Sequence, residues 1–151
     1  MDIKKLKPSG KYTHGDFQKY NPKKYVGNFP IIYRSSYELR FMIQLEFNPS
    51  VESWNSENIT IPYMMEEISK GKRVLKKHNY HMDFQVFMRN GVKYLCEVKP
   101  MAYVPLNNTQ IRNSPEHRKN ACKWRAAINW CKLNNHIFKI ITETQLKIPL
   151  T

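Results

Sequence analysis

Three charged residues interrupt two apolar segments between residues 81 and 100. Asp83 lies in HMDFQVFM, while Glu97 and Lys99 lie in VKYLCEVKP, with a short turn at residues 89–91 between them. The segments predict two adjacent strands, and because side chains alternate along a strand, Glu97 and Lys99 point to the same face. Two converging carboxylates repel each other unless a cation lies between them, and Mg²⁺ suits such a pair best. The residues therefore predict a divalent-metal site. A buried ion pair, in which Lys99 neutralises one of the acids, is the alternative.

A third carboxylate, Glu38, lies on the apolar side of a predicted helix. Within residues 33–47, Glu38 falls at helical spacing with Phe41, Met42 and Leu45, and Ser35 is suited to be the N-cap. Ser35-x-x-Glu38 also fits a capping box, in which the glutamate accepts a hydrogen bond from the N-cap amide. We interpret Glu38 as support for the metal, directly or through water, which can coexist with the capping role.

The predicted elements follow the order helix, three strands, helix, strand. The strands are residues 57–65, 79–88, 92–100 and 136–143, and the second helix is 116–135. Trp124, Ala127, Ile128 and Cys131 are expected on the apolar side of that helix. The segment SKGKR, residues 69–73, is expected to be a basic turn. This order predicts a mixed α/β domain with one central sheet and helices packed against it.

The charge of the chain favours a polyanionic partner. Its 151 residues hold 25 Lys and Arg against 12 Asp and Glu, a formal net charge of +13. Neutralising phosphates releases counterions and favours such an excess, although a ribosome-associated or membrane-surface protein could share it. No segment is apolar enough to span a membrane and no signal peptide is evident, so we expect a soluble cytoplasmic protein. Cys96, Cys122 and Cys131 lack the spacing of a disulfide framework or a zinc knuckle and are expected to be reduced.

The first 30 residues differ from the rest in composition. They combine Lys with Gly, Pro and aromatic residues without a helical period, which divides the chain into a basic arm (1–30) and a single domain (31–151). The candidate DNA contacts of the arm are Lys11, Lys23 and Lys24, with Tyr12, Phe17, Tyr20 and Tyr25 available for stacking. The alternative is an arm that packs its aromatic side chains against the domain.

The elements and residues described above resemble the core of the PD-(D/E)XK nucleases. The resemblance covers about residues 30–143, and its motif is Met82-Asp83 followed by Glu97-Val98-Lys99, with Met82 where the name-giving proline would stand. Two wider stretches, IIYRSSYELRFMIQLEFNPSVESW and YLCEVKPMAYVP, are similar to the head completion nucleases of T-even-type tailed phages. The N-terminal half of the transposon end-cleaving transposase subunit has a related pattern. The resemblance implies a restriction-endonuclease-like core.

The resemblance also implies Mg²⁺-dependent hydrolysis of DNA phosphodiesters, with Mn²⁺ able to substitute. Asp83 and Glu97 would bind the metal, the Val98 carbonyl would add a ligand, and Glu38 would complete the shell through water or bind a second metal. Lys99 would orient or activate the attacking water and neutralise charge at the phosphate. The remaining candidate DNA contacts are Lys119 and Lys123 on the second helix, His81 beside the site, and Lys72 and Arg73 in the basic turn. His78-x-x-His81 is also compatible with zinc, although no cysteine partner accompanies it.

The phage resemblance implies a place of action. The substrate would be double-stranded DNA at the packaged head, near portal or neck proteins in the cytoplasm of the infected cell, and retention in the virion stays open. Two other functions stay open as well: a transposition-type subunit that cuts one strand with a recombinase partner, and a non-enzymatic DNA-binding head component. An RNA-binding protein would explain the charge but not the acids within the strands.

Overall fold

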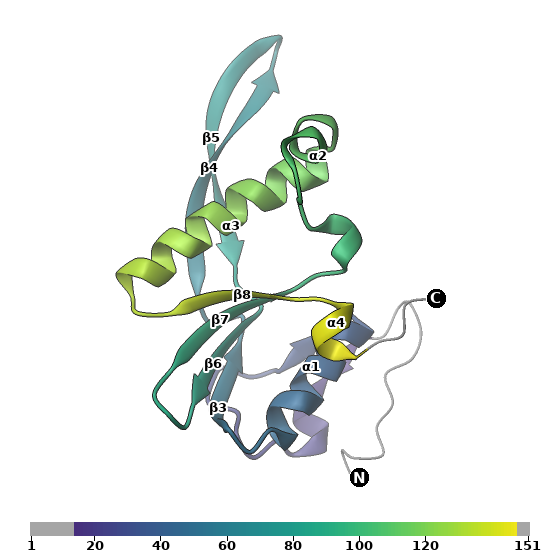
Figure 1. Ribbon diagram of the computed structural model, residues 1–151, viewed down its shortest axis with the longest axis vertical. Helices are drawn as coiled ribbons and strands as arrows, with labels where there is room; N and C mark the ends of the chain where they lie inside the picture. The colour runs from purple at the N-terminus through teal and green to yellow at the C-terminus, as the bar shows by residue number, and fades with distance from the viewer. Residues whose placement is uncertain (1–13, 148–151) are drawn as a thin grey trace.

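A four-stranded mixed sheet lies at the centre of the protein, whose computed structural model describes residues 14–147 (Figure 1). Its strand order is β3 (Val51–Ser56), β6 (Phe84–Met88), β7 (Lys93–Val98) and β8 (Ile137–Ile141). The first two neighbouring pairs are antiparallel, and β7 and β8 are parallel. Helices α1 (Ser36–Phe47) and α3 (Pro115–Leu133) pack on opposite faces. The predicted restriction-endonuclease-like arrangement, one central mixed sheet flanked by helices, is confirmed.

Alternation along β7 separates two hydrophobic cores. Cys96 and Val98 are buried together with the apolar side of α1, whereas Leu95 is buried with Trp124 and other residues of α3. Because successive side chains face opposite sides of a sheet, Glu97 shares the α3 side with Leu95. A carboxylate is therefore directed into the layer between the sheet and α3, where it needs compensating partners.

Strands β4 (Thr60–Ser69) and β5 (Lys72–His81) form a separate two-stranded sheet that projects from the body (Figure 1). The prediction of one strand at 79–88 was wrong, because Met82 and Asp83 lie outside regular strands and separate β5 from β6. Most of β5 was not predicted because the side chains of KRVLKKHN are mainly polar on both faces of the strand. Strand β3 was missed as well, since two of its buried side chains, Asn55 and Ser56, are polar.

Helix α3 begins at Pro115, one residue before the predicted helix, with Ser114 as its N-cap. Its buried side includes Trp124, Ala127 and Cys131 as predicted, but Ile128 is 44% exposed, so its expected burial was wrong. The fully buried Asn120 lies on that side instead, and its amide donates to the Tyr103 carbonyl at 2.9 Å. Two short helices, α2 (Asn108–Asn113) and α4 (Glu143–Leu146), lie in segments for which no helix was predicted.

Residues 14–30 are packed against the rest of the domain. Strand β1 (Gly15–Asp16) pairs with β2 (Ile32–Tyr33), and Phe17 and Tyr20 are buried in the same core as α1. The ring of Tyr25 lies edge-on to Trp54, with 4.9 Å between ring centroids. For these aromatic residues the packing alternative is the one that the structure shows.

The basic residues of this segment are partly engaged as well. The backbone amides of Lys23 and Lys24 donate to the carboxylate of Glu46 on α1, and Lys24 Nζ donates to the Asn48 carbonyl at 2.6 Å. Lys11 and Tyr12 lie outside the described residues.

Two further expectations concern the whole described chain. Cys96, Cys122 and Cys131 are free thiols, as predicted. Between residues 14 and 147, no helix combines the length and the apolar character needed to cross a membrane.

Candidate active site

Asp83 and Glu97 meet where β6 and β7 lie side by side. The register pairs Phe84 with Cys96, so Asp83, one residue before β6, lies next to Glu97 on β7. Asp83 Oδ2 accepts a hydrogen bond of 2.8 Å from the Val98 amide. Glu97 is 4% exposed, and its Oε2 accepts a hydrogen bond from the Tyr80 hydroxyl. Each acid is thus oriented by a hydrogen bond, Asp83 from β7 and Glu97 from β5, which forms a hairpin with β4.

Glu38 faces the same site from the first turn of α1. Ser35 is the N-cap, and its Oγ accepts from the Glu38 amide at 3.1 Å. The second half of the expected capping box differs, because Glu38 Oε2 accepts from the Arg34 amide, at 2.7 Å, in place of the Ser35 amide. The capping contacts therefore fix the carboxylate at the helix start, close enough to influence the other two acids.

The three carboxyl groups share one electrostatic environment. Burial raises the pKa of Asp83 well above its usual range, and the charges of Glu97 and Glu38 and a hydrogen bond with Glu97 raise it further. The hydrogen bond from the Val98 amide lowers this pKa and so opposes the shift. Burial also raises the pKa of Glu38, with the Arg34 amide and guanidinium opposing the shift and Glu97 adding to it. The predicted convergence of these acids is therefore present in the structure, and burial together with the neighbouring carboxyl groups favours the protonated form of Asp83.

The raised pKa of Asp83 predicts a pH dependence of stability. In the unfolded chain this carboxyl titrates at about 3.9, and in the folded protein it titrates at higher pH. Its contribution to stability is fully present below the unfolded pKa and is lost as the pH rises through the folded pKa. In EDTA, the free energy of unfolding of the wild type should therefore fall relative to that of Asp83→Asn as the pH rises above about 4. Urea denaturation at a series of pH values measures the difference, and parallel profiles for the two proteins would contradict it.

Lysines border the acids on the side of α3. Lys99 directly follows β7, and its Nζ lies 3.8 Å from Glu116 Oε1 on α3. Lys123 Nζ lies 4.5 Å from the centre of the Tyr80 ring. Burial lowers the pKa of Lys123, the charges of Glu97 and Asp83 raise it, and Lys99 and Lys119 lower it. The ion pair that the structure gives Lys99 is with Glu116, not with Asp83 or Glu97, so the alternative of a simple strand ion pair is not supported.

Tyr80 and Glu116 are site residues that the sequence analysis missed. Burial, the charge of Glu97 and the hydrogen bond to it raise the pKa of Tyr80 far above its ordinary value, so the hydroxyl remains a donor to Glu97. A tyrosine in a strand is normally part of a core, and a glutamate in the first turn of a helix normally caps it. Neither residue carried a sequence signal that separates it from these ordinary roles.

Replacing Tyr80 by phenylalanine isolates the hydrogen bond to Glu97. The phenylalanine side chain would keep a ring beneath Lys123 but could not donate to the carboxylate, which would lose a group that orients it. Loss of such a supporting contact typically costs 10- to 100-fold in activity or metal affinity, and we expect a decrease of about tenfold in cleavage rate. Tyr63→Phe, on the neighbouring strand, is the control. Equal rates for both variants would show that the Tyr80 hydroxyl does not support the site.

The other candidate DNA contacts are spread over the molecule. His81, Lys119 and Lys123 line a pocket of about 380 Å³ between the hairpin and α3. Lys72 and Arg73 lie at the far end of the hairpin, next to its turn. Lys23 and Lys24 lie at the C-terminal end of α1, at the opposite end of this helix from Glu38. Their roles in DNA binding stay predictions, as does the metal-binding role of the Val98 carbonyl.

The donor set fits Mg²⁺ better than zinc. His78 Nε2 lies 2.6 Å from Glu67 and His81 Nδ1 lies 3.1 Å from Thr60 Oγ1, so the two histidines have separate partners. In residues 14–147, no three His, Cys, Asp or Glu side chains are grouped to hold a metal by themselves. Mg²⁺ is typically bound through one or two carboxylates, waters and substrate phosphates. Asp83 and Glu97, two neighbouring carboxyl groups whose repulsion a cation would compensate, provide such a pair.

A mixed sheet with a helix on each face, and two acids that meet on its neighbouring central strands, is the arrangement of restriction-endonuclease-like nucleases. The chain belongs to the family of TnsA-like endonuclease N-terminal domains, which matches residues 48–143. It is also similar to the head completion nuclease of Enterobacteria phage T4, with 30% identity over 152 residues that cover 92% of this chain and 93% of the relative. The predicted relationship to both groups of nucleases is confirmed.

Proposed function

We propose that this protein is a Mg²⁺-dependent deoxyribonuclease that processes packaged phage DNA at the head before head–tail joining. The observation that carries the proposal is the contact between Asp83 and Glu97, two partly or fully buried acids bordered by Lys99 and Lys123 in a chain of net charge +13. A protein that only bound DNA would gain nothing from buried acids that repel phosphate.

Each group has a distinct chemical task in this proposal. Asp83 and Glu97 would hold the metal, with the Val98 carbonyl and Glu38 completing its shell. The bound metal supplies an acidified water and a Lewis acid for the phosphoryl oxygen. Lys99 positions the attacking water and stabilises the negative charge that grows on the phosphate, and Lys123 adds a second cation from α3. Tyr80 keeps Glu97 oriented.

The place of action is proposed from the phage relative. The similarity to a phage head completion nuclease covers 93% of that relative. It supports the proposal that the protein acts on a DNA end or junction at the filled head, next to portal or neck proteins, in the infected host cell. The TnsA-like family supports a second candidate, a subunit that cuts one strand and needs a recombinase partner.

Cleavage of supercoiled plasmid by the purified protein tests the proposal. We expect nicked or linear product with Mg²⁺ or Mn²⁺ and none with EDTA, and we expect the protein to cut without a partner protein. Ca²⁺, which binds carboxylates but is larger and less strongly polarising, is the control metal. Metal-independent cleavage would contradict the proposed chemistry. Tight DNA binding without cleavage under all conditions would favour a subunit that needs a partner, and addition of a recombinase would then restore strand cutting.

A further inference from the structure

The β4–β5 hairpin forms a long and regular two-stranded ribbon. Each of its strands has 10 residues, paired from Thr60–His81 to Ser69–Lys72. Lys70 and Gly71 close it, both with positive φ (51° and 76°), as a tight two-residue turn requires. Nine steps of about 3.3 Å give a length of roughly 30 Å. The ribbon therefore carries its tip far from the site while β5 connects the tip directly to Tyr80 and Asp83.

The outer part of the ribbon exposes apolar side chains. Ile68 is 79% exposed and Leu75 is 62% exposed, and the register, which opposes Ile68 to Arg73 and Glu66 to Leu75, places both on one face. In the described chain, β5 pairs with β4 alone. An isolated two-stranded ribbon is marginally stable in water, and exposed apolar side chains at its end stabilise nothing in the free protein. These features indicate that the ribbon end contacts another molecule.

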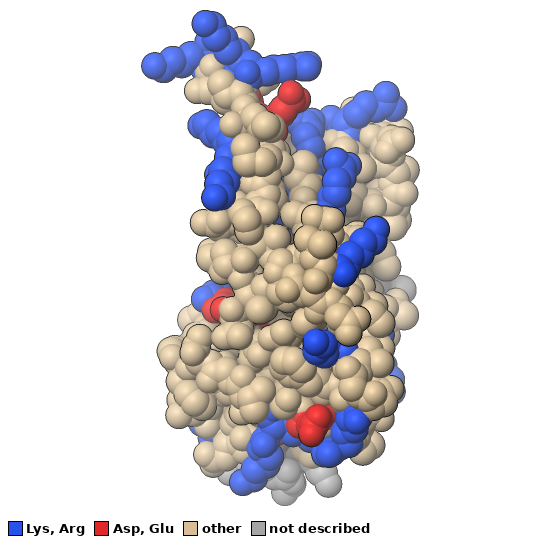
Figure 2. All heavy atoms as spheres, turned by 90° about the vertical axis from the view of Figure 1, so that its left-hand side faces the viewer, with Lys and Arg blue, Asp and Glu red and all other residues tan. Residues whose placement is uncertain are grey.

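The charge of the ribbon end identifies the kind of partner. Residues 69–77 contain no acid and five basic residues, which are Lys70, Lys72, Arg73, Lys76 and Lys77. Figure 2 shows Lys and Arg side chains gathered at this end of the molecule, with few acids among them. Basic strands with exposed apolar side chains suit the groove of a nucleic acid duplex, where the cations contact phosphates and the apolar groups contact sugars and bases.

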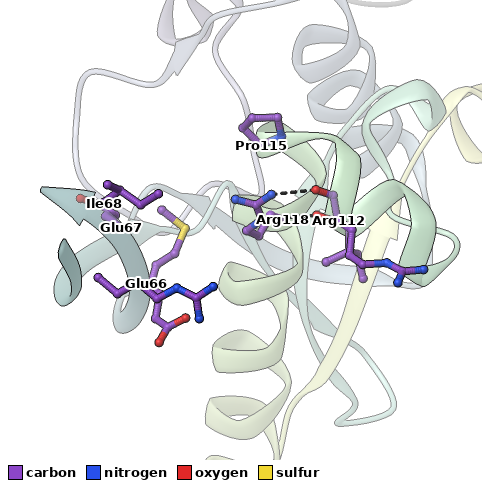
Figure 3. Close-up of a pocket in the computed structure, with 9 residues that line it drawn as sticks. Glu66, Glu67, Ile68, Arg112, Pro115 and Arg118 are labelled. Atoms are coloured by element: carbon purple, nitrogen blue, oxygen red, sulfur yellow. Dashed lines mark hydrogen bonds between the residues drawn. The ribbon is translucent and has the colours of Figure 1, made fainter. Parts of the chain in front are cut away.

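A groove connects the ribbon end to the site. A pocket of about 630 Å³ lies between the ribbon and helices α2 and α3, with Glu66, Glu67 and Ile68 on one side and Arg112, Pro115 and Arg118 on the other (Figure 3). It shares Met65 and Glu67 with the 380 Å³ pocket that Tyr80 and Lys123 line beside the site.

Basic side chains follow this groove, and its acids are partly compensated. The guanidinium of Arg118 donates hydrogen bonds to the backbone carbonyls of Ile111 and Arg112, and its positive charge lines the groove. Glu67 pairs with His78 at 2.6 Å and with Lys76 at 3.6 Å. A basic path therefore leads from the acids to the ribbon end. It consists of Lys123, Lys119, Arg118, Arg112 and Arg73.

We propose that duplex DNA lies along this groove of the protein and that the ribbon end enters the major or minor groove of the DNA about one helical turn from the cleaved bond. The residues of the ribbon end that would contact the DNA are Ile68, Lys70, Lys72 and Arg73. The inference rests on the proposed nuclease function. The ribbon length of roughly 30 Å is close to the turn of B-DNA, about 34–36 Å. The tip and the metal site would therefore hold the same side of the duplex, and only DNA of about ten base pairs or more beyond the site could reach both.

Binding to duplexes of different length, measured in EDTA so that no DNA is cut, tests the proposal. The variants are Lys72→Gln/Arg73→Gln, which removes two tip charges, and Ile68→Ser, which removes the apolar contact. The control is Lys139→Gln/Lys147→Gln, which removes two exposed charges on β8 and just after α4. Fluorescence anisotropy with duplexes of about 8 and about 24 base pairs, at several salt concentrations, gives Kd and its salt dependence.

We expect the tip double variant to weaken binding of the long duplex about fivefold or more and to reduce its salt slope by about 2, one for each lost phosphate contact, with little effect on the short duplex. Ile68→Ser should weaken binding of the long duplex without changing the slope. The control should change both duplexes by the same small factor.

Equal effects of the tip variant on both duplexes, or none on either, would overturn the proposal and leave the ribbon end to a protein partner. Because these measurements do not depend on cleavage, such a result would leave the nuclease function standing. Failure of the nuclease function would instead appear as uncut plasmid with Mg²⁺.

Discussion

Replacing Asp83 by Asn, or Glu97 by Gln, is expected to slow DNA cleavage severely and at the same time to stabilise the protein in EDTA. Each replacement removes a proposed metal ligand, for which we expect a rate loss on the order of 10³-fold. Each also removes one of two neighbouring acids that repel each other when both are ionised. The amide oxygen of either replacement can still accept the hydrogen bond from Val98 or Tyr80. The free energy of unfolding at neutral pH should therefore rise by about 1 kcal/mol.

Two measurements on the same proteins check this result. Plasmid cleavage with Mg²⁺ gives the rate, and urea denaturation in EDTA gives the stability. Glu52→Gln is the matched control, because Glu52 is an exposed acid on β3, and its variant should resemble the wild type in both assays. If the inactive variants are also less stable, the acids have a structural role that the proposed metal site does not explain.

Replacing Lys99 by Ala is expected to slow the cleavage step about 10²-fold while DNA binding changes little. Lys99 lies two residues after Glu97 and on the same side of the chain, and in the proposed mechanism its ammonium acts where negative charge grows in the transition state. Glu116 holds this ammonium from α3, and Glu116→Gln should give a smaller decrease, because the charge of Lys99 remains.

Single-turnover cleavage at saturating protein separates this step from binding. The matched control is Lys119→Ala, which removes an exposed lysine from the same helix face as Lys123 and should mainly raise the DNA concentration needed for half-maximal rate. A Lys99→Ala protein that cuts at the wild-type rate once saturated would show that Lys99 only binds DNA.

The acids of the site could be predicted because their polarity conflicts with their positions. Asp83 and Glu97 stand in apolar strands and Glu38 stands on the apolar side of a helix, so each requires compensation that a sequence reader can notice. Tyr80 and Glu116 could not be found in this way. An aromatic residue in a strand and an acid in the first turn of a helix satisfy ordinary preferences, and their roles depend on which elements the fold brings together.

The fold could be predicted where one face of an element is apolar and the other polar. Helix α1 meets this condition. Strands β6 and β7 could be predicted for a different reason, because they are mainly apolar runs buried on both faces, and the order of the core elements followed from these three. The outer part of β5 is mainly polar on both faces, and its two apolar residues, Val74 and Leu75, are adjacent in sequence, so its residues carry no alternation. Phe17 was placed in an arm by the composition around it, yet the structure buries it completely, since packing depends on a side chain's neighbours in space.

Thermal unfolding with and without Mg²⁺ or Mn²⁺ tests the central claim, that Asp83 and Glu97 form a metal site, most directly. A ligand that binds only the folded state at about 100 times its Kd stabilises by about 2.7 kcal/mol, which for a chain of this length raises Tm by about 5–10 °C. We predict such a rise for the wild type and for Glu52→Gln, and none for Asp83→Asn or Glu97→Gln. An unchanged Tm for the wild type, or the same rise in all four proteins, would contradict the assignment of the metal to these two acids.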